Sequence, residues 1–394
     1  RLSKIRAMRL MHGLVFLGIA SLATSGFSQA WTTQAGNYAR TNFTPQVYDL
    51  SKARELWRKP ILFNSFDPHQ PIASGSIVYF SYRSLAPRID AVQVKTGDLR
   101  WSTPRTSVLA VHQPTLAHGQ LYYQSKDFAA SRIQALDPSS GLVLWDRTHP
   151  AQNQNYFAGT AVGTTMYFPS GFVGGITRYN PDGSFQWINA EIPDFGEWTA
   201  GQFAGWVWVF TNRLQRISPE GVATTTAVDG SNPFSSGFMG TPMIVTPTGT
   251  AFAGRRGEVL RLNLLNGTIA TKVTVLPGFA ARNEIALDGN EVFSLGFRKV
   301  LSLNPATLAT NWEVAFDDII PAHMLVTRSH IFLSGTAGSG QTIALNRQTR
   351  QVDWRYFASG PMALADDRLY IATNSERVAI QLRPEEDRVR TPRP

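Results

Sequence analysis

The chain has 394 residues, of which 43% are hydrophobic and only 16% are charged, with 32 Gly, 23 Pro, 10 Trp and no Cys. Low charge together with many aromatic and turn-forming residues is typical of an all-β protein, and it excludes a disordered chain or one built from long charged helices. The absence of cysteine excludes disulfide bonds, thiolate metal sites, a cysteine nucleophile and a lipid anchor on cysteine.

Residues 1–30 have the pattern of a secretory signal peptide. Four basic residues precede the apolar run 14–23, and a short stretch of small and polar residues ends at Ala30. The apolar run is much shorter than the ~20 residues that a membrane-spanning helix requires, which disfavours a retained anchor. We therefore expect an exported, soluble protein that does not span a membrane, is periplasmic or secreted, and starts near Trp31.

The remaining charge gives little information about partners. Four of the 37 Lys and Arg residues lie in the leader, which leaves 33 basic residues against 28 acidic ones. No block of basic residues follows, so nucleic acid is not a predicted partner. The small excess could attract an acidic envelope polymer, although ordinary surface charge explains it equally well.

One element recurs along the whole mature chain. It is an apolar segment, a polar turn, a glycine and, four residues after the glycine, a tryptophan, as in the segment from Gln134 to Trp145. Its last positions lie 38 to 46 residues apart: Trp57, Trp101, Trp145, Trp187, Thr225, Thr271, Trp312 and Trp354. Leu308 and Arg350 stand where two later copies would have the glycine. Thr225 and Thr271 predict weaker contacts between adjacent repeats.

A second element runs in step with the first and completes the repeating unit. A small or proline-led segment, a tight turn and an aromatic run follow one another eight times, with landmarks at Tyr79, Tyr122, Tyr167, Trp208, Ala251, Phe293, Phe332 and Tyr370. These segments read as a β-hairpin, and the first element supplies a third and a fourth strand. Four strands per unit at this period indicate a β-propeller blade.

The phase of the repeat predicts how the ring closes. A lone fourth strand at Trp57 precedes the first hairpin, and the last unit ends in a third strand at 378–382 with no later tryptophan. We expect an eight-bladed propeller over residues 31–382 in which the N-terminal strand completes the last blade, with seven blades as the alternative if one degenerate copy is absorbed. Residues 383–394 contain little to bury and are expected to form a disordered tail.

The segment from Ala135 through Gly141 to Trp145 resembles the tryptophan-docking repeat of quinoprotein-type, PQQ-like propellers. The opening residues Trp31, Gly36, Asn37, Asn42-Phe43-Thr44 and Trp57 are similar to the start of such proteins. The resemblance implies that the indoles pack against the neighbouring blade. The family includes both quinone-dependent dehydrogenases and non-catalytic members such as the outer-membrane assembly lipoprotein, which binds a partner through its loops. This chain resembles the second type more closely.

In the dehydrogenases the resemblance implies pyrroloquinoline quinone (PQQ) beside a Ca²⁺ ion, with a catalytic Asp and often a vicinal Cys pair. This chain has no Cys and no cluster of Asp, Asn and Glu at the spacing of hard-cation ligands. Asp317-Asp318 is the better candidate of the two acidic doublets before the tail, because Asp366-Asp367 falls in a hairpin turn. We therefore expect no catalytic residue, no metal site and no cofactor.

The positions just before each first strand predict a ligand site at the mouth of the central channel. A His-Gln-Pro triplet occurs there twice, and the channel-lining position of later blades carries other residues. The candidate site residues are His69, Gln70, His112, Gln113, Trp198, Arg282, Asn283, Asp317, Asp318 and His323. Histidines from adjacent blades could bind a metal or an anion, or respond to pH. The alternative is that the triplet only starts a blade, with Gln or His bonded to backbone groups.

These observations favour an exported, monomeric, non-catalytic propeller that binds an envelope or extracellular protein or glycan through its loops. Trp198 is the predicted aromatic anchor for that contact. The alternative is a PQQ-dependent alcohol or sugar dehydrogenase with PQQ and Ca²⁺ in an atypical site that lacks the Cys pair. A glycan hydrolase is disfavoured because no catalytic carboxylate pair can be recognised.

Overall fold

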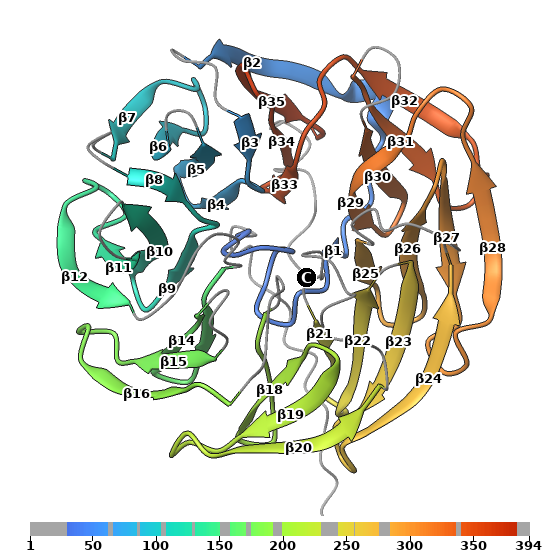
Figure 1. Cartoon of the computed structure of the whole chain (residues 1–394). Helices are drawn as coiled ribbons and strands as arrows, with labels where there is room; N and C mark the ends of the chain where they lie inside the picture. Colours follow the sequence, from blue (N-terminus) through green and yellow to red (C-terminus); the bar gives the residue numbers. More distant parts are fainter. Residues whose placement is uncertain are drawn as a thin grey trace, which may run out of the picture.

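Eight β-sheets form a closed ring around a central channel (Figure 1). This computed structural model describes residues 30–61, 66–84, 87–103, 108–127, 131–149, 158–170, 175–191, 199–229, 243–255, 257–275, 284–335 and 340–383. The predicted signal peptide and tail lie outside these residues, apart from Ala30 and Arg383. The all-β, eight-bladed propeller is confirmed, and the seven-bladed alternative is wrong.

The strands of the first half follow one another blade by blade. Blade 1 contains β3 (Phe66–Pro68), β4 (Ile72–Ser74), β5 (Ile77–Ser84), β6 (Arg88–Gln93) and β7 (Leu99–Ser102). Blade 2 contains β8 (Val108–Val111), β9 (Thr115–Ala117), β10 (Gln120–Asp127), β11 (Ser131–Leu136) and β12 (Val143–His149). Blade 3 contains β13 (Thr160–Val162), β14 (Thr165–Pro169), β15 (Ile176–Tyr179) and β16 (Phe185–Asn189). Blade 4 contains β17 (Gly201–Phe203), β18 (Trp206–Phe210), β19 (Arg213–Ile217) and β20 (Ala223–Val228).

The second half repeats this plan. Blade 5 contains β21 (Ile244–Val245), β22 (Thr250–Arg255), β23 (Glu258–Asn263) and β24 (Thr268–Thr274). Blade 6 contains β25 (Ile285–Leu287), β26 (Val292–Gly296), β27 (Lys299–Leu303) and β28 (Thr310–Ala315). Blade 7 contains β29 (Pro321–Thr327), β30 (His330–Gly335), β31 (Thr342–Asn346) and β32 (Val352–Tyr356), joined at its inner edge by β1 (Phe43–Thr44). Blade 8 contains β33 (Met362–Ala365), β34 (Arg368–Ala372), β35 (Glu376–Gln381) and β2 (Arg54–Pro60), and the short 3₁₀ helix η1 (Leu50–Lys52) precedes β2.

The N-terminal strand closes the ring, as predicted. β2 pairs antiparallel with β35, and Trp57 lies opposite Ala379 in that register. Because this pairing supplies the fourth strand of blade 8, that blade does not present the edge of its third strand. The first and last parts of the propeller are therefore held together by hydrogen bonds between segments about 320 residues apart in sequence.

In the first four seams of the ring, counted from blade 8 to blade 4, an indole docks on a glycine of the next blade. A Cβ atom added to Gly141 would lie 2.6 Å from the Trp101 ring, and Trp101 Nε1 donates a hydrogen bond of 3.1 Å to the Pro138 carbonyl of the same turn. The same arrangement joins Trp57 to Gly97, Trp145 to Gly183 and Trp187 to Gly221. The prediction that these tryptophans pack against the neighbouring blade is confirmed.

In the next three seams, from blade 4 to blade 7, the indole or the glycine is replaced. In blade 4 the strand bulge lies elsewhere, so Thr226, next to the predicted Thr225, contacts Gly267 of blade 5. Leu308 adopts the positive φ of the glycine it replaces, at 59°, and its side chain is buried. Arg350 also has a positive φ, and its guanidinium lies 3.8 Å from the centre of the Trp312 ring.

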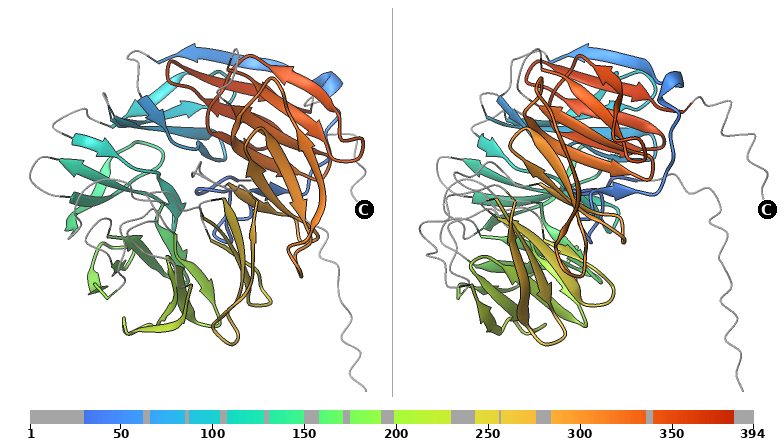
Figure 2. Two further views of the ribbon diagram at one scale, coloured as in Figure 1. Left: turned by 45° about the vertical axis from the view of Figure 1, so that its right-hand side comes forward. Right: turned by 90° about the vertical axis from the view of Figure 1, so that its right-hand side faces the viewer.

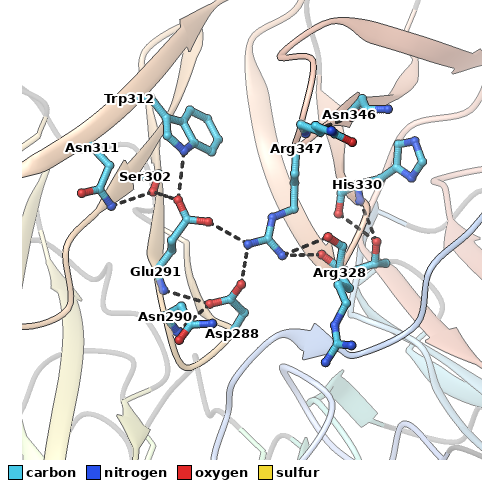
Figure 3. Close-up of polar contacts among 12 residues, drawn as sticks. Asp288, Asn290, Glu291, Ser302, Asn311, Trp312, Arg328, His330, Asn346 and Arg347 are labelled. Atoms are coloured by element: carbon cyan, nitrogen blue, oxygen red, sulfur yellow. Dashed lines mark hydrogen bonds and ion pairs between the residues drawn. The ribbon is translucent and has the colours of Figure 1, made fainter.

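Charged groups connect blades 6 and 7 beside that stacked pair (Figure 3). Arg347 of blade 7 donates hydrogen bonds to Asp288 and, at 2.7 Å, to Glu291 of blade 6. The other Glu291 oxygen accepts hydrogen bonds from Ser302 and from Trp312 Nε1. Burial opposes the ionised carboxylate, but the bonds from Ser302, Arg347 and Trp312 lower the pKa of Glu291. We call Arg347, Asp288 and Glu291 the charged clamp.

The core consists of eight similar layers between the blades. One aromatic residue of each second strand faces the next blade, as Tyr79 does in the apolar cluster shared by blades 1 and 2. In blade 5 this residue is Phe252, which packs against blade 6. The predicted landmark Ala251 is wrong by one position, because it faces blade 4 instead. The extra turn residue before Thr250 accounts for the shift.

Residues 31–48, which we call the N-terminal segment, cross the centre of the ring (Figures 1 and 2). Backbone hydrogen bonds attach the segment to the inner strands of blades 1, 2, 5, 6 and 7: Trp31 to Ala73, Thr32 to Leu116, Ala39 to Val245, Thr41 to Leu287 and Asn42 to Val326. These partners lie where the inner strands finish. The channel therefore has a closed end, filled by the N-terminal segment, and a mouth end, where the inner strands begin.

Candidate functional site

The mouth end brings the two predicted histidines together. The rings of His69 and His112 lie 6.4 Å apart between centroids, at the start of blades 1 and 2. His69 Nε2 lies 3.1 Å from the Val111 carbonyl. Burial, the neighbouring His69 and the nearby Arg83 and Lys126 hold the pKa of His112 well below its ordinary value, so His112 is neutral at pH 7.

Both glutamines of the His-Gln-Pro triplets bond to backbone groups. Gln70 accepts a hydrogen bond of 2.6 Å from the Ala35 amide of the N-terminal segment and donates one of 2.7 Å to the Met362 carbonyl of blade 8. Gln113 donates to the Gln70 carbonyl at 2.8 Å. These contacts tie blade 8, blade 1, blade 2 and the N-terminal segment together, which is the role described by the blade-start alternative.

His323 lies farther round the mouth, in blade 7, and is paired with a carboxylate that the sequence did not single out. His323 Nδ1 is 3.0 Å from Glu284 Oε1, and Glu284 Oε2 accepts a hydrogen bond of 2.7 Å from the Met324 amide. Both side chains are partly exposed. The pair joins blade 6 to blade 7 where their inner strands begin.

Asp317 and Asp318 lie at the rim of the mouth end and not in the channel. Both are exposed, in the connection between β28 and β29. The Asp317 carbonyl accepts a hydrogen bond from Arg298, and Asp318 forms an ion pair of 2.6 Å with Arg355. The ion pair joins the outer part of blade 7 to the connection that leaves blade 6.

Two exposed phenylalanines flank these charged residues. Phe297 precedes Arg298 in a hairpin turn of blade 6 and is 60% exposed, and Phe357 follows β32 and is 71% exposed. We call Phe297, Arg298, Asp318, Arg355 and Phe357 the rim patch. Sequence reasoning missed both phenylalanines, although an aromatic residue in a hairpin turn, where polar residues are usual, is the signal that could have indicated Phe297.

The other three candidate residues cannot be placed. Trp198, Arg282 and Asn283 lie outside the described residues. The described strands before and after these residues have their nearest ends at the mouth end of the ring. Of the seven candidates that are described, the structure brings together His69, Gln70, His112 and Gln113, and it places His323 and the two aspartates elsewhere on the mouth end.

Arg40 of the N-terminal segment is a buried cation that no sequence pattern indicated. Its guanidinium donates to Thr33 at 2.7 Å and to the Gly159 carbonyl and Thr160 hydroxyl of blade 3, both at 3.1 Å. Burial lowers its pKa to about 10, so it remains charged at neutral pH. Arg40 connects the N-terminal segment to blade 3, which makes it part of the support of the mouth and not an open ligand site.

The described residues do not fit a quinone site with Ca²⁺. No group of three or more His, Asp or Glu side chains among them is arranged to hold a metal ion. Glu284, a carboxylate at the start of the blade 6 inner strand, already lies beside His323 and accepts a hydrogen bond from the Met324 amide. A Ca²⁺ ion needs six to eight oxygen ligands, and this pair supplies too few. The absence of a cofactor stays a prediction.

Comparison with known proteins agrees with this architecture. The family model described as "Outer membrane protein assembly factor BamB" matches residues 45–202 and 255–389. This chain belongs to that family. Among curated proteins no sequence match is found. Members of the BamB family and quinoprotein dehydrogenases share the propeller, so membership alone does not decide between binding and catalysis.

Two solved structures illustrate this division. BamB from Moraxella catarrhalis has a TM-score of 0.62 and 14% identity, covering 84% of this chain and 99% of its own. Quinohemoprotein alcohol dehydrogenase from Comamonas testosteroni has a TM-score of 0.71 and 13% identity, covering 90% of this chain and 80% of its own. At such identities the likeness shows the fold alone. Among the described residues no helix is long and apolar enough to cross a membrane.

Proposed function

We propose that this protein is a non-catalytic scaffold that binds a protein of the bacterial envelope through the rim patch. The observation that carries the proposal is the contrast at the mouth end. At the mouth, Gln70 and Gln113 bond to backbone carbonyls and His323 lies beside a carboxylate. Phe297 and Phe357, in contrast, stay exposed beside charged groups. Aromatic residues, Phe among them, and arginines are enriched in the buried centres of protein interfaces.

Family membership supports the same proposal. The BamB family is named for outer-membrane protein assembly, and the propeller gives a rigid support for a binding surface. The proposed location is therefore the envelope, reached by export through the leader at residues 1–30. A monomer with a stiff ring and a small aromatic surface suits a transient partner of standard interface size, in which about 800 Å² is buried on each side.

Photo-crosslinking in intact cells tests the proposal. A benzophenone amino acid is placed at Phe297 or Phe357, with matched controls at Leu142 and Phe185, which are 69% and 52% exposed outside the rim patch. We expect one defined crosslinked envelope protein from the rim positions and none from the controls. Equal crosslinking from all four positions, or crosslinking to glycan alone, would overturn the proposal of a protein partner at this patch.

A biochemical assay tests the dehydrogenase alternative separately. Purified protein is incubated with PQQ and Ca²⁺, and dye-linked oxidation of alcohols and sugars is measured. We expect neither stoichiometric PQQ binding nor turnover, because the described part of the mouth has no set of calcium ligands. Activity in this assay would overturn the proposal that the scaffold is non-catalytic, whatever the crosslinking shows.

A further inference from the structure

A cavity of about 680 Å³ lies between blades 5 and 6 at the closed end, away from the rim patch. Phe252, Pro247, Leu287, Pro305 and Ala306 form apolar walls, and the N-terminal segment supplies further wall residues. Small-molecule sites in proteins usually have volumes of ~300–1,000 Å³ and are mostly apolar with a few polar groups. The cavity therefore has the size and lining of a ligand site.

The repeat explains why the cavity is large at this seam. An equivalent cavity between blades 1 and 2 measures only about 430 Å³. There, Tyr79 Oη and Trp101 Nε1 both donate to the Pro138 carbonyl, at 2.9 Å and 3.1 Å. Between blades 5 and 6 the matching residues are Phe252, which has no hydroxyl, and Thr271, which replaces the tryptophan.

The same substitutions change the chemistry of the cavity. Pro305 occupies the place of Pro138, and no donor from the described part of the chain reaches its carbonyl. The Pro305 carbonyl therefore lacks the two donors that the Pro138 carbonyl has beside the smaller cavity. A ligand that enters beside Pro305 would meet a mostly apolar wall with a few polar side chains, among them Thr246 and Thr248.

One cation also lines the larger cavity. Arg261 pairs with Phe252 on one side and Thr271 on the other, in the register where blade 1 has Ala91 between Tyr79 and Trp101. Its Nε is buried and makes no hydrogen bond to the described residues. The second charged group of the lining, Asp288, is already bound by Arg347 in the charged clamp.

We propose that this cavity binds a small amphipathic anion, an apolar ring or chain that carries one carboxylate. The apolar body would occupy the space bordered by Phe252, Pro305 and Ala306, and the carboxylate would accept hydrogen bonds from Arg261. Arg261 is the cation of this lining, and a charged hydrogen bond between a guanidinium and a carboxylate is among the stronger ones in proteins. The proposal is independent of the scaffold function at the opposite face.

A matched pair of ligands tests the charge requirement. We would titrate the full chain with 1-naphthaleneacetate and with the neutral 1-naphthaleneacetamide, using calorimetry and ligand-observed NMR. We expect one site that binds the acid and binds the amide at least tenfold more weakly, which is the size of effect of a charged hydrogen bond. Equal binding of the two ligands, or no binding of the acid at millimolar concentration, would overturn the proposal.

Two variants with a matched control locate the site. Ala306→Trp fills the cavity, and Ser139→Trp places the same bulk in the equivalent turn that lines the cavity between blades 1 and 2. We expect Ala306→Trp to abolish binding and Ser139→Trp to leave it unchanged. Arg261→Gln should weaken binding of the acid at least tenfold without affecting the amide. Far-UV circular dichroism confirms folding, and Arg261→Lys, which keeps the charge, should retain part of the affinity. Binding that survives Ala306→Trp, or is lost equally in Ser139→Trp, refutes this location.

Discussion

The two halves of the ring hold adjacent blades together in different ways. In the seams from blade 8 to blade 4, an indole lies on a positive-φ glycine and donates a hydrogen bond to a carbonyl of the same turn, as Trp145 does with Gly183 and the Pro181 carbonyl. In the later seams the glycine or the indole is replaced, by Leu308 and Thr271 between blades 5 and 6 and by Arg350 between blades 6 and 7.

The comparison shows that the tryptophan dock is one of several ways to fill the same place. In a docked seam the tryptophan of the outer strand fills the space between the blades. Between blades 5 and 6 the Leu308 side chain, which comes from the turn, supplies apolar volume instead, so the smaller Thr271 is enough at the tryptophan position. Arg350 stacks on Trp312, and the charged clamp takes over the bond that a turn carbonyl would have made with the indole. A degenerate repeat can thus remain a well-packed seam if its partner position changes with it.

The largest effect is expected from removing a docked indole. Trp145→Ala should lower the free energy of unfolding by about 4 kcal/mol, because a buried tryptophan leaves a cavity that the rigid blades cannot collapse around. The matched control Thr271→Ala should cost less than about 1 kcal/mol, since it removes only a small side chain. Urea unfolding followed by far-UV circular dichroism measures both. Similar losses in the two variants would show that the halves do not differ in this respect.

The charged clamp is the corresponding anchor of the substituted half. Arg347→Met should cost about 3 kcal/mol, because Asp288 and Glu291 would be left as poorly hydrated carboxylates without their cation. The double variant Arg347→Met/Glu291→Gln should recover part of that loss, which a urea titration of the single and double variants would reveal. The two groups do not act as a pair if Glu291→Gln lowers the free energy of unfolding by the same amount in the Arg347→Met variant as in the natural protein.

A methyl group at a docked glycine should cost slightly less. Gly141 has a φ of +74°, and an added Cβ would lie 2.6 Å from the Trp101 ring. We expect Gly141→Ala to destabilise the protein by about 2 to 3 kcal/mol, of which ~1–2 kcal/mol is left-handed backbone strain. Gly75→Ala is the control, because its φ of +60° carries the same strain but nothing lies within 4 Å of the added atom. Thermal unfolding should place the control well above Gly141→Ala in melting temperature.

Acid should weaken the docked half selectively. Burial lowers the pKa of His149 to about 4, against the opposing effect of the bond to the Pro169 carbonyl, and burial also keeps the pKa of His112 low. The unfolded chain binds a proton at each histidine near pH 6.5, so stability is complete above that pH and falls as the pH drops toward 4. His149 alone accounts for about 2 kcal/mol at pH 5.

Hydrogen exchange at pH 7 and pH 5, corrected for the intrinsic exchange rate, measures this effect blade by blade. Protection should fall first in blades 2 and 3, around the buried His112 and His149. His149→Gln removes one titrating group and should reduce the loss between pH 7 and 5. A uniform loss of protection across all blades would contradict a separation between the halves.

The eight-bladed ring could be predicted from the sequence because each blade has its own copy of the repeat. The spacing of Trp57, Trp101 and the later landmarks gave the number of blades, and the lone copy at Trp57 gave the closure onto β35. The landmark of blade 5 failed because one additional turn residue moves the forward-facing aromatic from Ala251 to Phe252, a shift that alternating apolar residues do not reveal.

The mouth and the closed end were less predictable, because their contacts come from residues far apart in sequence. The partners of Gln70 lie in the N-terminal segment and in blade 8, and His323 meets a carboxylate from another blade. In the sequence Arg40 does not differ from a surface arginine, because its partners in blade 3 lie about 120 residues away along the chain. No local pattern indicates that the N-terminal segment fills the channel, because several of its hydrogen bonds join its backbone to the backbone of inner strands.

The smallest net effect, and the sharpest test of the comparison, comes from exchanging one kind of seam for the other. Thr271→Trp alone should be destabilising because the new indole would overlap the buried Leu308, and Leu308→Gly alone should leave a cavity. The two together recreate the docked pair, since the bulge register at Thr271 matches that at Trp101 and Leu308 already has a glycine-like φ of 59°. The double variant should therefore be within about 1 kcal/mol of the natural protein, with a favourable coupling of ~2–3 kcal/mol between the sites. Additive losses in this urea-unfolding cycle would mean that the two seams are built on different backbone geometries, and that Leu308 and Thr271 do not compensate for each other.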